Sequence, residues 1–386
     1  MTQVEVPHAP DGQTTARTAT TVSGRLVTVG VEEEFLLVDE RNRTVAPRAA
    51  AVLAGAAHLG ATVQQEMTLF QVETSTPVCS TMTELHTQLT ALRRTVDGMA
   101  RQHGMRINAT GTAVLGHPPT PPITDAPRYR RIAERFGSLI DGQSICGCHV
   151  HLGVSAPESA LLVMNHLRPW LPTLLAMSAN SPFWHGRDTR HASWRYLIFG
   201  RWPTAGPPPH FASVDDYDAA VRTLLRSGAA LDRGMIYWDV RRSCNHPTIE
   251  LRVCDVAPTP DEAVLIAALT RALGTQALLG GGPRRDERPV SQAALRAALW
   301  RAAHDGLEGR GVDVVSGRTV RAFSLVEQLV QQVRDELVDC GDLELVLDLV
   351  ARLRERRSGA YRQRVAFAER GDLADVVDML SAQTVA

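Results

Sequence analysis

Two glutamates, Glu32 and Glu34, lie in a segment of the chain that otherwise has the composition of a β-strand. The segment, residues 27–38, is rich in valine, phenylalanine and leucine, and strand side chains alternate between two faces. The two carboxylates therefore share a face, about 7 Å apart at a rise of roughly 3.3 Å per residue. Like charges at this spacing repel each other, and a divalent cation between them would remove the repulsion because hard cations bind carboxylate oxygens. The alternative is an edge strand whose acids are solvated.

A second segment, residues 146–151 (CGCHVH), contains residue types that bind zinc. In a strand, however, Cys146 and Cys148 lie on one face while His149 and His151 lie on the other, so four ligands cannot converge on one ion. The cysteines are then either small buried hydrophobic residues or a separate redox pair. The histidines are the better candidates, as metal ligands or as hydrogen-bond donors to phosphate. A hydrogen-bonded core histidine is the alternative for each.

A third group of charged residues lies on apolar segments further along the chain. Glu250 and Arg252 alternate with apolar residues in the segment 248–255, so both face the same side of a strand, and Arg241 lies in the segment before it. An internal salt bridge would explain them. The functional alternative has Glu250 bound to a metal ion while the two arginines hold a phosphate or a substrate carboxylate by bidentate contacts.

Two further acids belong to an earlier part of the chain. Glu73 lies in the apolar segment 71–77, where an unpaired carboxylate would be costly to bury, and Glu66 precedes it. A surface location would explain either acid. Considered together, however, five segments present acids, histidines and arginines on otherwise apolar strands, and a purely structural role explains that pattern poorly.

The elements that must position these residues are predicted from periodicity and turn signals. Strands are expected before residue 256 and helices dominate after it, which predicts an α+β fold. The predicted strands and extended segments are residues 27–38, 63–73, 106–111, 144–154, 234–242 and 248–253. The predicted helices are residues 85–99, with a capping box from Thr81 to Glu84, residues 129–139, a segment between Pro157 and Pro172, residues 215–226, and four or five helices after Pro260.

The composition excludes several classes of protein. The chain has 386 residues and a net charge of −1, which does not suggest binding to nucleic acid or to a membrane surface. It contains no lysine, so its 41 basic residues are all arginines. A Walker A loop and Schiff-base chemistry are thereby excluded, and a nucleotide would be held by metal ions and arginines. Residues 1–24 are expected to be a disordered tail, and six cysteines in a chain of this length fit a cytoplasmic protein with reduced thiols.

Four motifs, in this order, resemble the glutamate–cysteine ligase superfamily, and in particular its type 2 carboxylate–amine ligase (YbdK-like) group. They are residues 30–34 (GVEEE), 73–77 (ETSTP), 147–151 (GCHVH) and 249–256 (IELRVCDV). The similarity runs from about residue 25 to the C-terminus. It implies one catalytic domain over residues 25–386 that is mainly helical from about residue 257. It also implies a glutamine-synthetase-like core, in which a curved antiparallel sheet forms a funnel-shaped active site with helices packed outside.

The resemblance further implies a site that uses ATP and Mg²⁺, with Mn²⁺ as an alternative ion. The metal ligands that it implies are Glu32, Glu34, Glu66, Glu73, His149 and Glu250. Arg241 and Arg252 would contact the phosphates or an acyl phosphate, and His151 would line the same nucleotide pocket. A substrate carboxylate would attack the γ-phosphoryl group to give the acyl phosphate, from which an amine would displace phosphate to form an amide.

Glutamate as the acid and cysteine as the amine are the default substrates of the family, and type 2 members are weak glutamate–cysteine ligases. The alternatives are ligation of a different acid and amine in specialised metabolism, a metal-dependent phosphotransferase or hydrolase, and a non-catalytic binding protein. Arg187, Arg190 and Arg195 could contact a substrate carboxylate, with at least two of them expected at the surface. The expected partners are small molecules, not nucleic acid or membrane, and a homodimer is expected from the family alone.

Overall fold

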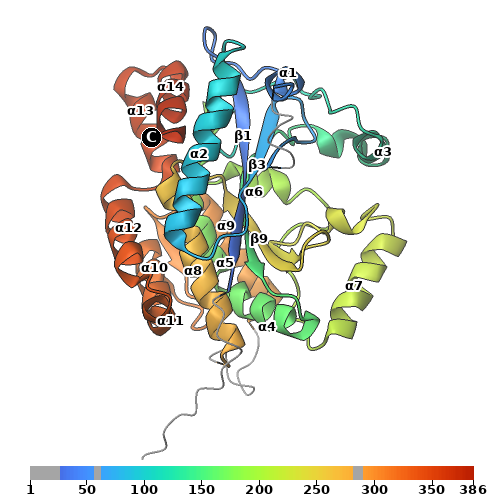
Figure 1. Ribbon diagram of the computed structural model, residues 1–386, viewed down its shortest axis with the longest axis vertical. Coiled ribbons are helices and arrows are strands. Elements are labelled where there is room, and N and C mark those ends of the chain that lie inside the picture. Colours follow the sequence, from blue (N-terminus) through green and yellow to red (C-terminus); the bar gives the residue numbers. More distant parts are fainter. Residues whose placement is uncertain (1–26, 56–61, 281–289) are drawn as a thin grey trace, which may run out of the picture.

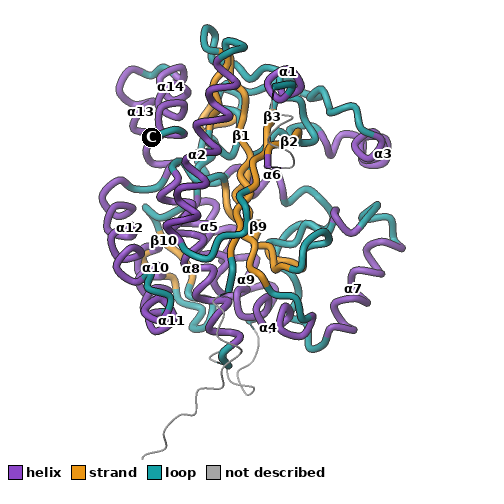
Figure 2. The backbone as a smooth tube through the Cα atoms, in the orientation of Figure 1, coloured by secondary structure: helices purple, strands orange, loops and turns teal. Residues whose placement is uncertain are grey.

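The structure is a computed structural model that describes residues 27–55, 62–280 and 290–386. The tail predicted for residues 1–24 therefore lies outside the described residues. Figure 1 shows strands running through the middle of the molecule with helices on both sides, and Figure 2 shows the same division by element type. The prediction of a mixed fold with an antiparallel sheet is confirmed, because every strand pair in the main sheet is antiparallel.

The main sheet has seven strands in the order β2-β3-β1-β5-β9-β8, with β4 paired to the end of β1. Its long central strand is β1, and neighbours on either side carry the remaining motifs. The bounds are β1 (Val29–Asp39), β2 (Val63–Gln65), β3 (Gln71–Ser75), β4 (Met105–Asn108), β5 (Gly147–Gly153), β8 (Val240–Arg242) and β9 (Thr248–Asp255). Two small hairpins are formed by β6 (Phe183–Trp184) with β7 (Arg187–Asp188), and by β10 (Arg310–Val312) with β11 (Thr319–Arg321).

One face of the main sheet is covered by α2 (Met82–Arg101), α4 (Pro157–Leu167), α5 (Leu171–Ser178) and α8 (Pro260–Leu278). Half of the capping box predicted for α2 is confirmed, because the Thr81 side chain accepts from the Glu84 backbone N–H. The Glu84 carboxylate accepts from the Ser80 N–H, one residue before the N-cap Thr81. The other helices are α1 (Ala49–Leu53), α3 (Pro127–Phe136), α6 (Trp194–Phe199), α7 (Val214–Arg226), α9 (Gln292–Asp305), α10 (Ala322–Gln332), α11 (Arg334–Asp339), α12 (Leu343–Arg356), α13 (Gly359–Arg370) and α14 (Leu373–Thr384).

The covered face of the sheet forms the core of the protein. Val31, Val150 and Leu251 come from three neighbouring strands and are buried in one hydrophobic cluster. Cys148 belongs to the same cluster, and Cys146 is buried in a second one. Both cysteines are free thiols, so they are small buried residues, one of the two roles predicted for them. The histidines of this segment project from the opposite face, as the strand alternation predicts.

Two predicted extended segments are shorter than expected. Residues 63–73 do not form one strand, because the chain reverses direction after β2 and the Gln71 N–H bonds to the Thr68 carbonyl before β3. Residues 234–242 are a strand only at their end, since Arg233–Met235 forms a 3₁₀ turn that the Asp232 side chain caps. The first correction places Glu66 on a loop rather than on a strand.

The helical parts also differ from the prediction. The segment between Pro157 and Pro172 is two α-helices joined by the 3₁₀ turn Arg168–Trp170, with Pro172 in the first turn of the second helix. Among the described residues, seven α-helices (α8 to α14) replace the four or five expected after Pro260. Two of the helices end just before a glycine in the left-handed conformation. Gly341 follows α11 with a φ of 73°, and Gly371 follows α13 with a φ of 71°.

A buried ion pair anchors β1 from the core side. The Glu33 side chain is fully buried and forms a bidentate pair with Arg93 of α2, whose Nε lies 2.8 Å from a Glu33 carboxylate oxygen. Arg93 also donates to the backbone carbonyls of Ala257, Pro258 and Thr384 at 2.7, 3.1 and 3.2 Å. One side chain thus joins the central strand to the segment after β9 and to the end of α14.

Candidate functional site

The uncovered face of the sheet lines a pocket of about 1220 Å³. Residues from α3, from α6 and from the segment before β8 form its opposite wall. All nine residues predicted to bind metal, nucleotide or phosphate line this pocket: Glu32, Glu34, Glu66, Glu73, His149, His151, Arg241, Glu250 and Arg252. Segments more than 200 residues apart in sequence are therefore brought together at one place.

Strand register explains why these side chains share a face. Residues paired directly across an antiparallel sheet point the same way, and Glu32 pairs with His149 while His151 pairs with Glu250. Glu34 pairs with Glu73 in the same manner on the other side of β1. Between β5 and β9 the register shifts, with one extra residue on β9 after Leu251.

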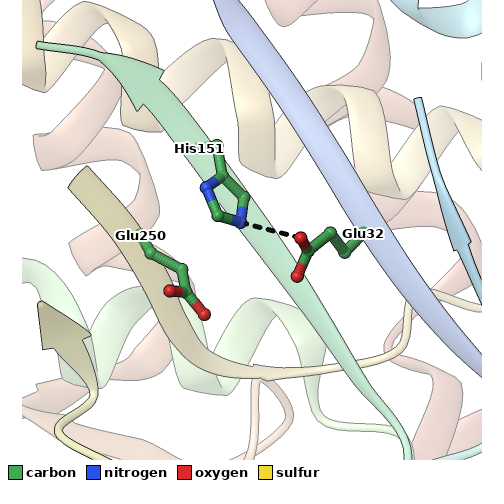
Figure 3. A group of neighbouring side chains, drawn as sticks. All are labelled: Glu32, His151 and Glu250. Carbon is green, nitrogen blue, oxygen red and sulfur yellow. Dashed lines mark ion pairs between the residues drawn. The ribbon is translucent and has the colours of Figure 1, made fainter. Parts of the chain in front are cut away.

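Glu32, His151 and Glu250 form one group of ligand atoms, which Figure 3 shows on three adjacent strands. One atom from each side chain lies within 4.8 Å of the others, and the His151 Nε2 is 3.3 Å from a Glu32 oxygen. The other ring nitrogen of His151 is 2.9 Å from the Thr248 hydroxyl. Within the described residues, this buried Nε2 has no partner other than Glu32, with which it forms an ion pair.

Glu32, Glu73 and His149 form a second group with the same 4.8 Å limit. The His149 Nδ1 lies 3.3 Å from a Glu32 oxygen, and its buried Nε2 has no hydrogen-bond partner among residues 27–55, 62–280 and 290–386. Glu73 accepts a hydrogen bond from the Gln64 side chain at 2.9 Å. Glu32 is common to both groups, and each group offers two carboxylates and one imidazole.

Burial makes part of this site unfavourable for unneutralised charge. Burial and the nearby Glu66 raise the pKa of Glu34 to about 8, and burial with the neighbouring carboxylates raises the pKa of Glu73 well above its usual value. Burial and the charge of Arg252 lower the pKa of His149 to about 4, which leaves its imidazole neutral and able to bind a metal. Burial would lower the pKa of His151, but Glu32 and Glu250 outweigh it and that pKa is raised. Crowded carboxylates beside the neutral His149 imidazole are the environment that a divalent cation stabilises.

Two of the carboxylates are ionised. Burial would raise the pKa of Glu32, but hydrogen bonds and charges of His149 and His151 outweigh it, and the pKa is lowered. Burial is likewise outweighed at Glu250, whose pKa is lowered by Arg252 and Arg241. These two acids keep a negative charge at neutral pH.

Two predicted ligands lie outside both groups. One Glu34 oxygen accepts the Gly147 backbone N–H at 2.6 Å, at the β5 end of the pocket. Glu66 lies on the loop between β2 and β3, where its carboxylate accepts the backbone N–H of Met67 at 2.8 Å. Both line the pocket, but neither belongs to the two groups of atoms within 4.8 Å.

The two predicted phosphate-binding arginines both pair with Glu250, so the internal salt bridge considered from sequence is present. Arg241 also donates to the carbonyls of Gly234 and Ile236 at 2.9 Å each, which uses most of its donors. The buried Nε of Arg252 has no partner in the part of the chain that the structure describes. Arg252 therefore has a free donor for a ligand, and a phosphate contact by either arginine stays a prediction.

The opposite wall of the pocket is aromatic. The rings of Phe199 and Trp202 lie 5.4 and 5.5 Å from that of Tyr237, and Tyr129 lines the same pocket. The Trp202 indole N–H donates to Gln143 at 3.0 Å. The sequence does not predict this wall, because its residues come from separate helices and loops that share no periodic pattern.

The three arginines considered as partners of a substrate carboxylate differ in their burial. Arg187 and Arg190 are exposed, which confirms the expectation for two of the three. Arg195 is buried and lines the pocket.

Within the described residues, no helix is long and apolar enough to cross a membrane.

Similar folds occur in two solved structures. The glutamate–cysteine ligase of Francisella tularensis in complex with AMP has a TM-score of 0.64 at 13% identity, over 94% of this chain and 89% of the other. A bifunctional glutathione synthetase from Pasteurella multocida has a TM-score of 0.64 at 15% identity, over 93% of this chain and 52% of the other. At these identities the likeness shows the fold alone.

Sequence relatives are much more similar. A protein of Saccharopolyspora erythraea named "Putative glutamate–cysteine ligase 2-1" is 48% identical over 360 residues, 93% of this chain and 95% of its own length. One from Mycobacterium sp. strain KMS, named "Putative glutamate–cysteine ligase 2-2", is 47% identical over 93% of this chain and 99% of its own. The family model for glutamate–cysteine ligase family 2 matches residues 28–379.

These matches define the protein first as a ligase that forms carbon–nitrogen bonds. The chain belongs to glutamate–cysteine ligase family 2, and it is an ATP-dependent carboxylate–amine ligase.

Proposed function

We propose that this ligase joins the side-chain carboxylate of glutamate to the amino group of cysteine, with weak activity for that pair, at a site that contains divalent cations. The observation that carries the proposal is the pair of ligand groups that share Glu32 on the pocket face of the sheet. The names of the relatives support glutamate and cysteine as substrates. The sheet face and the wall opposite it would together form the funnel expected for this fold.

The residues of the site fit Mg²⁺ or Mn²⁺. Each histidine lies in a group with two carboxylates, and the buried Nε2 of His149 has no hydrogen-bond partner among the described residues. Carboxylate oxygens suit these ions, and one imidazole per site is compatible with Mn²⁺ in particular. The proposed ligands are Glu32, Glu73, His149, His151 and Glu250, with Glu34 and Glu66 within the same pocket. Such ions neutralise the charge of the phosphates during phosphoryl transfer.

The chain's own residues would position the reactants. A substrate carboxylate oxygen attacks the γ-phosphorus of ATP and ADP leaves, which forms an acyl phosphate. The amine nitrogen then attacks the acyl carbon, phosphate leaves, and the nitrogen loses a proton as the amide forms. Arg252, with its free Nε, would stabilise the phosphate oxygens, while Arg241 holds Glu250 in place. The remaining contribution of the protein is orientation and exclusion of water.

The test is whether release of ADP and phosphate requires both substrates. ATP, Mg²⁺ and panels of acids and amines would be supplied, with the products identified by mass spectrometry. Amide formation with release of ADP only when an acid and an amine are both present is the expected result. Full release of phosphate from ATP alone would instead indicate a phosphotransferase or hydrolase, and a product from another pair would keep the reaction but change the substrates.

The cytoplasmic location and the homodimer stay predictions.

A further inference from the structure

Arg195 lies in the first turn of α6 and is only 2% exposed, yet it is one of the residues that line the pocket. The start of this helix is firmly held. Its Ser193 cap accepts from the Tyr196 N–H, and the Arg195 backbone N–H donates to the Ser181 hydroxyl at 3.0 Å. The position of Arg195 is therefore set by the fold and not by its own side-chain contacts.

The guanidinium of Arg195 makes few bonds for a buried charge. Its two contacts to backbone carbonyls, those of Val253 and Arg252, are both 3.5 Å long, and no described residue bonds to its Nε. The nearest carboxylate oxygen in an ion pair belongs to Asp255, at 3.9 Å. Asp255 already accepts from Asn180, Ser181 and Ser193 at 2.7–2.9 Å. Burying an underbonded charge is costly unless a ligand completes its bonding.

Arg93 shows what a structural arginine looks like in the same protein. It is equally buried, and all five of its N–H groups donate, to the Glu33 carboxylate and three backbone carbonyls. Arg195 differs in that most of its donors are unused or make only long contacts. That contrast indicates a residue kept for a partner that comes from outside the chain.

The surroundings of the Arg195 guanidinium favour a planar anion. Its Cζ lies over the Phe199 ring, 5.4 Å from the ring centroid, and this stacking fixes the plane of the guanidinium. A Cβ at Gly147 would collide with its Nη2 and lie 3.0 Å from the His149 Nε2, so the glycine lets the guanidinium reach the floor of the site. The guanidinium thus lies beside the proposed metal site without belonging to it.

We propose that Arg195 binds the second, non-reacting carboxylate of the acid substrate, and thereby selects amino dicarboxylates over acids with one carboxylate. A planar guanidinium with free donors binds a carboxylate by two parallel hydrogen bonds, which gives both affinity and orientation. Arg241 cannot serve in this way because its donors are used by Glu250 and backbone carbonyls. This inference rests on the proposed ligase function and assigns its acid specificity to one residue.

The test compares two acids that differ only in this carboxylate. Glutamate and 4-aminobutanoate both carry the reacting carboxylate and an amine, and the second lacks the α-carboxylate. In Arg195→Gln, kcat/KM for glutamate should fall by at least about 100-fold, while kcat/KM for 4-aminobutanoate and KM for ATP change less than about threefold. Arg222→Gln removes an exposed arginine of α7, outside the pocket, and should change none of these values.

Arg195→Lys is the second variant, because lysine keeps the positive charge but lacks the planar guanidinium. This variant should lose most of the preference for glutamate over 4-aminobutanoate, and its circular dichroism spectrum should match that of the wild type. An equal loss for both acids, or full discrimination by Arg195→Lys, would overturn the proposal in favour of a structural role. A raised KM for ATP alone would overturn it in favour of a phosphate contact.

The role of Arg195 can be tested even if glutamate is not the acid substrate. If the wild type turns over no glutamate, glutamate is not the acid. Calorimetric binding of a panel of dicarboxylates and their monocarboxylate analogues to wild type and Arg195→Gln would then decide the role of Arg195. Loss of dicarboxylate binding in the variant supports the assignment, and unchanged binding overturns it.

Discussion

The carboxylate of Glu32 is shared by both groups of ligand atoms, which makes it the least replaceable acid of the site. Glu73 and Glu250 each belong to one group only, and Glu250 also balances Arg241 and Arg252. A change at Glu250 would therefore disturb two buried arginines as well as a ligand position. Glu32 has no arginine partner among the described residues, so its replacement is the cleaner probe of metal binding.

A buried carboxyl outside the proposed metal site should make stability depend on pH. Burial raises the pKa of Asp239 to about 7 and outweighs the hydrogen bond from the Tyr196 hydroxyl at 3.1 Å, which lowers the pKa. Among the described residues, the other carboxylate oxygen has no partner. The folded state then holds a proton that the unfolded state releases near the usual value of 3.8. This group's contribution to stability is lost as pH rises towards about 7.

In Asp239→Asn, the side chain cannot become charged and the penalty disappears. The variant should gain stability relative to wild type between pH 5 and pH 8, by on the order of 1 kcal/mol or more, in urea unfolding at each pH. A difference between the two proteins that stays constant over this pH range would contradict the assigned pKa shift.

At the level of elements, the buried pair of Glu33 and Arg93 holds β1 against α2 and the end of α14. Arg93→Met should reduce the free energy of unfolding by about 3–5 kcal/mol, because it leaves a buried carboxylate unpaired. The matched control is Arg43→Met, which removes an exposed arginine paired with Asp378 and should cost no more than about 1 kcal/mol. Urea unfolding measures both.

A double replacement separates the charge from the packing. Adding Glu33→Leu to Arg93→Met removes the unpaired carboxylate and should recover part of the lost stability. If Arg93→Met costs no more than Arg43→Met, β1 does not depend on this pair.

Two glycines within helices give a second contrast at the element scale. A Cβ on Gly98 of α2 would meet no atom within 4 Å, so Gly98→Ala should stabilise the protein by about 0.5–1 kcal/mol through helix propensity. A Cβ on Gly274 of α8 would lie 2.6 Å from a Leu152 methyl carbon, so Gly274→Ala should cost about 1–3 kcal/mol. Thermal unfolding tests the pair, and equal shifts of the two variants would contradict the packing of α8 against β5.

For the molecule as a whole, one face of the main sheet lines the pocket and the other face belongs to the hydrophobic core. Its two-residue repeat could be followed in the sequence, which is why the faces of Glu32, Glu34, His149 and His151 were predictable before their neighbours were known. The resemblance to the family is what indicates that residues on these distant strands meet at one site. Periodicity alone does not specify which strands pair, since that depends on register across long sequence separations.

Other parts of the molecule could not be predicted for the same physical reason. Glu33 lies between two pocket-facing acids, and only the fold reveals that Arg93, 60 residues away, neutralises it in the core. The free donors of Arg195 are likewise a property of its surroundings and have no local signature. The sequence predicts too few of the short helices after residue 322, because their boundaries depend on single glycines and tertiary packing.

The acids and histidines of the pocket are proposed to hold divalent cations. The most direct test titrates Mn²⁺ into the protein in the presence of ATP and follows free Mn²⁺ by its paramagnetic resonance signal. Wild type and Glu40→Gln, which changes an exposed glutamate just after β1, should bind Mn²⁺ equally, while Glu32→Gln should bind at least about tenfold more weakly and lose nucleotide turnover. Equal Mn²⁺ affinity and turnover in all three proteins would contradict the account.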